Sequence, residues 1–236
     1  APANNTGLDW RIFGNDGNDT LNVSPIGRNL DAFGDDIIFE GNAGNDTLNV
    51  FDNNFAGGRV IDITNDSVDA GPVFGVGDLS YLTTENLNID AGSGNDTFNI
   101  LSTQPGVDNN FRGWDGDDTF NIPDGSTLGS LVQIFGGNND DRVNVTLTNV
   151  GGLASQVIFD GGSDDDRDSA VLTDRAGVAR SIAVEYAGNP SGQTEVGGFG
   201  SLFIGLFNET ILIDGDGPLD QLDVVGPTGI DDDITV

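Results

Sequence analysis

The 236-residue sequence contains no cysteine, methionine, histidine or lysine. Disulfides, thiol catalysis and zinc or haem sites built on Cys or His therefore have no ligands. Histidine acid–base chemistry and lysine Schiff bases are equally excluded. Long apolar runs are also lacking, since the longest one, from Leu202 to Phe207, is interrupted by Gly205. We therefore expect no membrane insertion.

Positive charge is scarce. Eight Arg oppose 39 acidic residues, 34 Asp and 5 Glu, for a net charge of −31. A chain of this charge is a poor partner for nucleic acid. Asp is preferred over Glu where a short carboxylate caps a turn or holds an ion. The acidic residues therefore indicate turns rather than a general solubilising surface.

One ten-residue pattern, Gly-x-x-Gly-x-Asp-Thr-(apolar)-Asn-(Val/Ile), recurs along the chain. Clear copies cover 14–23, 41–50, 91–100 and 113–122, and weaker copies start at Gly136, Gly161 and Gly215. We call the aspartate of each copy its anchor; the anchors are Asp19, Asp46, Asp96, Asp118, Asp141, Asp166 and Asp220. Most are 22 to 27 residues apart. The two gaps of about twice that length predict degenerate turns, with candidates at 63–68 and 189–196.

Apolar and polar residues alternate after each anchor, which indicates a strand with one buried face. The predicted inward residues are Leu21, Val23, Leu48, Val50, Phe98, Ile100, Phe120, Ile122, Val143 and Val145. The outward Thr and Asn residues are expected to form ladders between neighbouring repeats. A second strand is predicted before most turns, at 10–13, 37–39, 87–89, 131–135, 157–159 and 212–213.

A unit of strand, turn and strand cannot bury its apolar face alone, but stacked units form a continuous core. We therefore predict an all-β fold, a parallel β-solenoid of the β-helix or β-roll kind with 22–27 residues per coil. It would be a single domain over residues 1–236 with about nine or ten coils. A β-sandwich is the alternative, although it does not require one turn motif to recur.

The segment Gly-x-x-Gly-Asn-Asp-Thr-Leu-Asn resembles the repeats-in-toxin nonapeptide, Gly-Gly-x-Gly-x-Asp-x-(apolar)-x. The match covers seven segments of about ten residues. In proteins of that family the Asp carboxylates and turn carbonyls bind calcium between stacked turns. The resemblance thus implies a calcium-binding repeat protein of the secreted or cell-surface bacterial type.

Stacked turns would place the anchors in one column, with neighbours about 4.8 Å apart and mutually repelling. Oxygen ligands without nitrogen or sulfur favour calcium over transition metals. We predict Ca²⁺ at Asp16, Asp19, Asp46, Asp96, Asp115, Asp118, Asp141 and Asp166. The alternative is that each aspartate caps its turn through the backbone and leaves its charge in water.

These features predict a structural protein rather than an enzyme: a subunit of an extracellular or cell-surface fibre or matrix. Head-to-tail self-association is expected because no amphipathic capping helix is evident at either end. A glycan or a cell surface is a further candidate contact. The runner-up function is a calcium-stiffened module of a larger bacterial adhesin. A polysaccharide-acting β-helix enzyme ranks third, because no acid–base pair stands out among so many aspartates.

Overall fold

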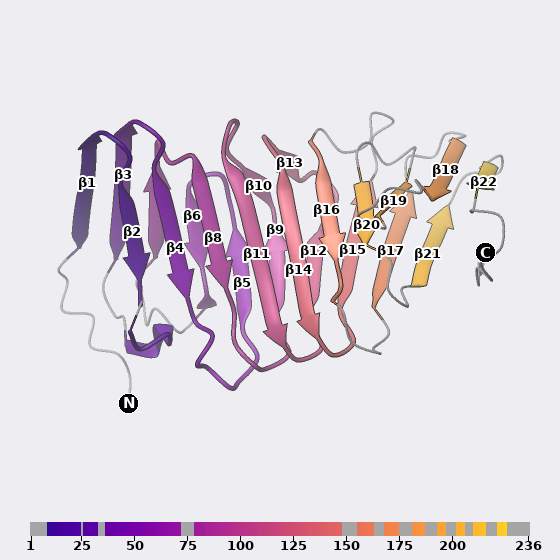
Figure 1. The fold of residues 1–236 in the computed structure, drawn as a ribbon, viewed down its shortest axis with the longest axis horizontal. Helices are drawn as coiled ribbons and strands as arrows, with labels where there is room; N and C mark the ends of the chain where they lie inside the picture. Colours follow the sequence, from indigo (N-terminus) through magenta and orange to yellow (C-terminus); the bar gives the residue numbers. More distant parts are fainter. Residues whose placement is uncertain are drawn as a thin grey trace.

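The computed structural model describes residues 9–24, 26–32, 36–71, 78–147, 155–162 and 168–174, together with five later strands within 181–225. The chain is all-β, and two ten-stranded sheets account for most of its strands. Figure 1 shows the strands of both sheets following one another along the long axis of the molecule. Most neighbouring strands are parallel, as the sequence predicts.

The first sheet, called sheet 1, contains β1 (Trp10–Asp16), β3 (Ile37–Ala43), β7 (Leu79–Leu82), β6 (Ser67–Asp69), β5 (Val60–Ile63), β9 (Thr97–Ile100), β12 (Thr119–Ile122), β15 (Arg142–Leu147), β17 (Ser169–Asp174) and β21 (Thr210–Gly215), in spatial order. Sheet 2 contains β2 (Thr20–Val23), β4 (Thr47–Phe51), β8 (Asn86–Asp90), β11 (Asp108–Asp115), β14 (Val132–Asn138), β16 (Val157–Asp160), β20 (Leu202–Gly205), β19 (Gln193–Val196), β18 (Ser181–Tyr186) and β22 (Gln221–Val225). A small parallel pair joins β10 (Ser102–Thr103) to β13 (Thr127–Leu128), and one 3₁₀ helix spans Leu30–Ala32.

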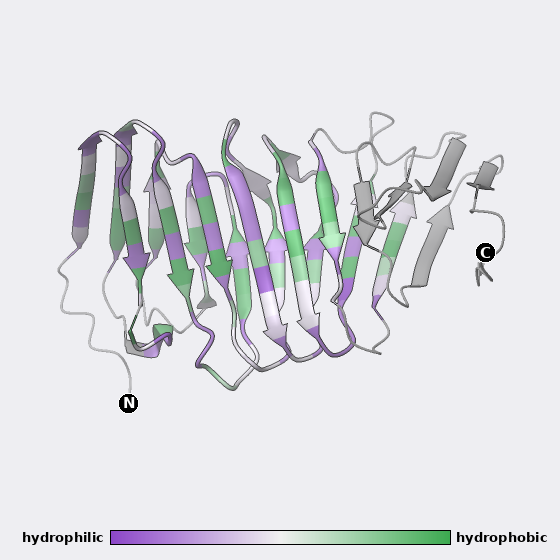
Figure 2. Cartoon of the chain, viewed as in Figure 1, coloured by the Kyte–Doolittle hydropathy of each residue, from purple (hydrophilic) through white to green (hydrophobic). Residues whose placement is uncertain are grey.

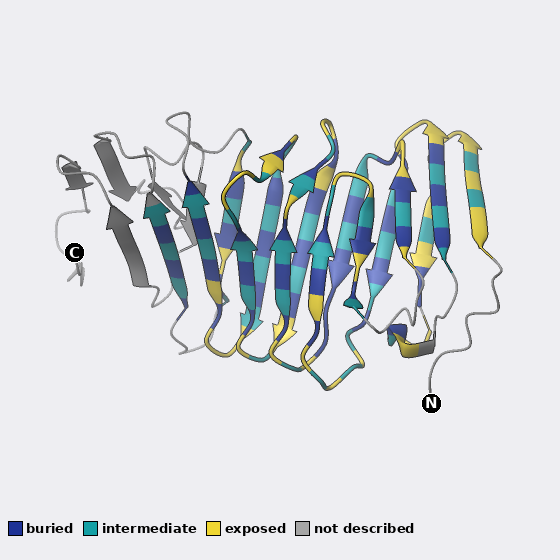
Figure 3. Cartoon of the chain, turned by 180° about the vertical axis from the view of Figure 1, so that it is seen from behind, coloured by how far each residue is buried: buried dark blue, intermediate teal, exposed yellow. Residues whose placement is uncertain are grey.

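The core lies between the two sheets. The chain passes repeatedly from one sheet to the other, so each repeat contributes a strand to both. Phe98 of sheet 1 contacts Phe111 of sheet 2 across the interior, with ring centroids 6.1 Å apart. It also stacks on Phe120 of the neighbouring strand at 4.7 Å. Alternating apolar and polar bands cross the strands in Figure 2, and alternating buried and exposed bands cross them in Figure 3.

The predicted inward residues are confirmed. All ten face the core, nine are buried, and Leu21 in the end strand β2 is half-buried. They share this face because successive side chains of a strand point to opposite sides of the sheet.

Each of the two long gaps between anchors contains a reversed strand. In the first gap, β6 runs antiparallel to both β5 and β7 within sheet 1. In the second gap, β19 runs antiparallel to both β18 and β20 within sheet 2. The prediction of a degenerate turn at 63–68 was therefore wrong, whereas residues 189–192 of the second candidate, 189–196, lie outside the described residues. Residues 63 and 68 face each other across a hairpin, and 193–196 is the reversed strand β19 itself.

No helix in the described part of the chain has the length and apolar character needed to cross a membrane.

Candidate functional site

The motif copies in the described residues form tight turns between the two sheets. In the first copy Asn15 has φ = 73° and Gly17 has φ = 117°, and the copy at 113–118 repeats this with Trp114 at 81° and Gly116 at 118°. Glycine and asparagine tolerate the left-handed region better than other residues. The Asn and the second Gly of the first two copies therefore suit the two left-handed positions of the turn, whereas Trp114 occupies the first of these positions in the fourth copy.

The anchors form two ladders and not one column. Asp19 and Asp46 precede strands of sheet 2, whereas Asp96, Asp118 and Asp141 precede strands of sheet 1. The strands of one sheet run mainly in one direction, so turns entering sheet 2 and turns entering sheet 1 lie at opposite edges. In Figure 1 the β1–β2 turn lies at the upper edge and the β11–β12 turn at the lower edge. The predicted single column was wrong. The three consecutive strands β5, β6 and β7 all lie in sheet 1, so the motif copies after them enter sheet 1 instead of sheet 2 and lie at the other edge.

Each ladder is held together by hydrogen bonds from the backbone of one repeat to the carboxylate of the next. In the first ladder, Asp19 N–H donates to Asp46 Oδ1 at 2.7 Å, and Asp46 N–H donates to Glu85 Oε2 at 2.7 Å. In the second, the N–H groups of Arg59, Asp96, Asp118 and Asp141 donate to Oδ1 of Asp96, Asp118, Asp141 and Asp168 at 2.7–2.9 Å. The capping alternative is therefore closer to the structure, but the capped N–H belongs to the preceding repeat.

The anchor side chains are also buried, which the capping alternative did not predict. Asp46, Asp96, Asp118, Asp141 and Asp168 are at most 2% exposed. Except at Asp96, whose turn opens with Ala91, each carboxylate lies against the glycine that opens its own turn. A Cβ on Gly113 would overlap the Asp118 carboxylate and lie 2.7 Å from the carbonyl oxygen of Gly136. The first glycine of the motif is therefore needed to make room for the carboxylate.

In four anchors, one of which is the half-buried Asp19, the second carboxylate oxygen has no hydrogen-bond partner. Oδ2 of Asp19, Asp46, Asp118 and Asp141 is buried without a hydrogen-bond partner. Asp96 differs, because its Oδ2 accepts from Gly92 N–H at 3.0 Å. A buried acceptor with no partner is costly, so these oxygens mark the chemically unusual part of the turn.

Burial raises the pKa of Asp118 to about 8 and the pKa of Asp141 to about 9. Removing a carboxylate from water disfavours its charged form, and neighbouring carboxylates add to the effect. The hydrogen bonds from the backbone act in the opposite direction but are outweighed. Burial raises the pKa of Asp96 as well.

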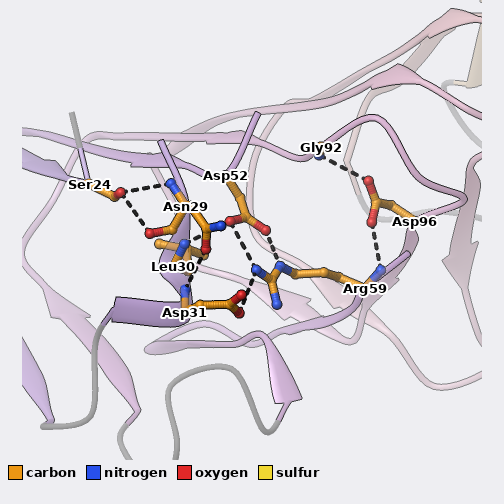
Figure 4. A network of polar contacts seen from close by, with 8 residues as sticks. All are labelled: Ser24, Asn29, Leu30, Asp31, Asp52, Arg59, Gly92 and Asp96. Carbon is orange, nitrogen blue, oxygen red and sulfur yellow. Dashed lines mark hydrogen bonds and ion pairs between the residues drawn. The ribbon is translucent and has the colours of Figure 1, made fainter. Parts of the chain in front are cut away.

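The second ladder begins at an arginine. The Arg59 side chain is 3% exposed and forms ion pairs with Asp52 and with Asp31, the latter at 3.0 Å. Asp52 also accepts from Leu30 N–H at 2.8 Å, which connects the network to the 3₁₀ helix. The guanidinium lies 3.5 Å from the centroid of the Phe55 ring. Figure 4 shows this network extending through the Arg59 backbone to Asp96. The sequence motif gives no indication of this buried cation.

The anchors do not provide the coordination that calcium requires. Calcium takes about six to eight oxygen ligands. At Asp118, Oδ1 accepts a backbone N–H, and the buried Oδ2 has no hydrogen-bond partner. Within the described ranges, no three acidic side chains are grouped so that they could hold a metal ion.

The remaining predicted ligands are placed differently. Asp16 and Asp115 are exposed, lie at opposite edges, and belong to separate ladders. Asp166 and Asp220 lie outside the described residues. Asp168 takes the anchor position that the sequence analysis assigned to Asp166, since it accepts from Asp141 N–H and directly precedes β17. Calcium binding at the exposed aspartates stays a prediction.

Outward-facing amides form a ladder on each sheet, which confirms the expected asparagine ladders. On sheet 1, Asn144 donates to Asn121, Asn121 to Asn99, and Asn99 to Asp62, at 2.6–2.9 Å. On sheet 2, the corresponding bonds of 2.8–3.0 Å connect Gln133, Asn110, Asn88, Asn49 and Asn22. These bonds fix the register of neighbouring strands from outside, while the apolar residues fix it from inside.

No protein-family model matches this chain, and no match is found among curated proteins.

Proposed function

We propose that the two sheets are the faces of a parallel β-solenoid with 22–27 residues per coil, and that the chain is a structural subunit joining end to end in an extracellular fibre or matrix. The supporting observation is the pair of open strand edges at each end of the described fold. β1 and β2 end the two sheets on one side, and β21 and β22 end them on the other.

The directions of these end strands are compatible with stacking. Sheet 1 contains two antiparallel pairings, of β6 with β7 and with β5. Sheet 2 also contains two, of β19 with β20 and with β18. Two reversals cancel, so β21 runs parallel to β1 and β22 runs parallel to β2. The β21–β22 end of one copy can therefore pair with the β1–β2 end of another as neighbouring repeats pair within the chain.

The side chains at the β1 end favour the same arrangement. Trp10 pairs in register with Ile37, yet Trp10 is 59% exposed and Ile37 only 6%. Ile12 is likewise half-buried, whereas its register partner Phe39 is buried. Figure 3 shows β1 as the most exposed of the described strands at this end. A second copy supplies the missing neighbour and buries this apolar cross-section.

The test is the mass of the purified chain by light scattering across a concentration series at physiological ionic strength, where repulsion between charged subunits is screened. Trp10→Asp places a charge in the proposed contact. Phe13→Asp is the matched control, because Phe13 is 50% exposed on the same strand but has the opposite side-chain direction.

We expect concentration-dependent growth of the wild type, weaker growth for Trp10→Asp and unchanged growth for Phe13→Asp. Equal effects of the two substitutions would contradict the end-to-end contact. A monomer at every concentration favours the runner-up, a stiff module of a larger adhesin. An extracellular location, the likeness to repeats-in-toxin proteins and calcium at the exposed aspartates remain parts of the proposal supported by the sequence.

A further inference from the structure

The resemblance implies calcium at the anchors, but their surroundings do not fit it, and a different group must occupy the buried oxygens. We propose that Asp118 and Asp141 are neutral carboxylic acids, each donating a hydrogen bond from Oδ2 to the main-chain carbonyl of the glycine that opens the next turn. This hydrogen bond takes the place of the metal ion at these two anchors.

The geometry repeats in both turns. A Cβ on Gly113 would overlap Asp118 Oδ2 and lie 2.7 Å from the carbonyl oxygen of Gly136, so both oxygens lie next to the space that this glycine leaves. A Cβ on Gly136 would likewise overlap Asp141 Oδ2 and lie 2.6 Å from the carbonyl oxygen of Gly161. Two acceptors that converge without a donor repel each other, whereas one proton between them makes a hydrogen bond.

The acceptor carbonyls can take this bond. The Gly161 carbonyl already accepts from Gly137 N–H at 2.7 Å, and a carbonyl oxygen has a second lone pair. Oδ1 of each acid stays bonded to the backbone N–H of the preceding anchor. A neutral acid therefore satisfies both of its oxygens, whereas an ionised one leaves Oδ2 without a partner.

The charged groups around the two acids disfavour ionisation. Asp118 faces Asp96, Asp115 and Asp117, and Asp141 faces Asp117, Asp118 and Asp168. The arginines nearest in sequence bond elsewhere: Arg112 pairs with Asp90 at 3.2 Å, and Arg142 donates to Ser169 at 3.3 Å. Both acids thus have carboxylates as neighbours, and their pKa values are raised accordingly.

The test compares Asp118→Asn with Asp118→Ala, and the same pair at Asp141, in the full chain. Asparagine reproduces a neutral acid, because its oxygen accepts the N–H and its amide donates to the carbonyl. At pH 6 we expect the Asn variants to keep the unfolding constant within about tenfold of wild type. The Ala variants should raise it about ten- to hundredfold. Chelator at constant ionic strength should shift the unfolding midpoints of wild type and Asn variants equally, because any calcium at the exposed aspartates is independent of the anchors.

Asp52→Asn is the matched control, because Asp52 is buried but both of its oxygens accept from the Arg59 guanidinium, so an amide there places N–H donors against a cation. We expect this amide to be damaging where the anchor amides are not. Asn variants as unstable as Ala variants would overturn the proposal. The proposal would also be overturned if chelator destabilised the wild type but not the Asn variants, because that result would place a metal ion on the anchors.

A second measurement applies even if the variants fail to fold. In wild-type protein labelled with ¹³C at the aspartate carboxyls, we expect two signals of neutral acid at pH 7 that titrate near pH 8 and 9. Ionisation of every aspartate at pH 7 would overturn the proposal.

Discussion

Replacing Gly113 by alanine tests the packing of an anchor over its glycine. Gly113 has no left-handed φ, so alanine is compatible with its backbone and would ordinarily stabilise the chain slightly. Here the added Cβ overlaps the Asp118 carboxylate and lies 2.7 Å from the Gly136 carbonyl oxygen. The backbone of the next repeat cannot move without breaking the ladder, so Asp118 must swing out.

The cost follows from what Asp118 then loses. The Asp96 N–H, which donates to Asp118 Oδ1 at 2.7 Å, is left buried without a partner, at about 1–3 kcal/mol. Overpacking adds about 1–3 kcal/mol. Reduced freedom of the unfolded chain offsets about 0.4–1 kcal/mol. We expect the free energy of unfolding to fall by about 2–4 kcal/mol, a large part of the usual 5–15 kcal/mol.

The assay is denaturant unfolding followed by circular dichroism. Gly125→Ala is the control, because Gly125 has open space around its Cβ position and a φ of 81°, so only strain of about 1 kcal/mol is expected. The double variant Gly113→Ala, Asp118→Ala should be less damaged than the sum of its parts, because the clash is gone. Additive losses, or equal losses at Gly113 and Gly125, would refute the packing argument.

Three further predictions concern the core, the buried cation and pH. Phe120→Ala should lower the free energy of unfolding by about 3–5 kcal/mol, because Phe120 is fully buried and stacks on Phe98. Chemical denaturation measures this loss, and a loss below about 1 kcal/mol would contradict the prediction. Arg59→Met should cost about 3–5 kcal/mol by leaving Asp52 buried without its cation, and adding Asp52→Asn should restore part of the loss in the same assay. Because the folded pKa of Asp118 and of Asp141 exceeds the unfolded value, the folded state binds more protons. The free energy of unfolding should then fall by up to about 1.4 kcal/mol per pH unit for each group as pH rises from about 4 to about 8 or 9, and should level off above that range. A melting temperature that rises with pH across this range would contradict the raised pKa values of the two acids.

Much of the fold was predictable because strand formation here depends on local alternation. Phe98, Asn99 and Ile100 differ in polarity at each step, and a strand with one buried face is the conformation that satisfies this pattern. The asparagine ladders were predictable for the same reason, since identical positions of stacked strands bring identical side chains together.

The division into two ladders could not be read from the repeat spacing. Spacing along the chain does not report which sheet a strand joins. Because β5, β6 and β7 all join sheet 1, the strand after the motif belongs to sheet 2 before them and to sheet 1 after them, although the motif is the same. Two ladder positions are also occupied by unexpected residues, Glu85 in the first ladder and Arg59 in the second. No motif copy marks either position.

The last described anchor could have been found from the sequence. Ser169, Ala170, Val171 and Leu172 align in register with the strand that follows Asp141, which places Asp168 and not Asp166 at the anchor position. The weaker motif copy conceals this, because two additional residues separate its first glycine from its anchor. Alignment of the alternating strands, rather than of the glycines, was the informative signal.

Negative-stain electron microscopy of the purified chain, in calcium and then in chelator at constant ionic strength, tests whether open strand edges join the subunits without calcium at the buried anchors. We expect fibres of one width in both conditions. Separate short rods in both conditions would contradict end-to-end assembly, and fibres that disappear on chelation would contradict its independence from calcium.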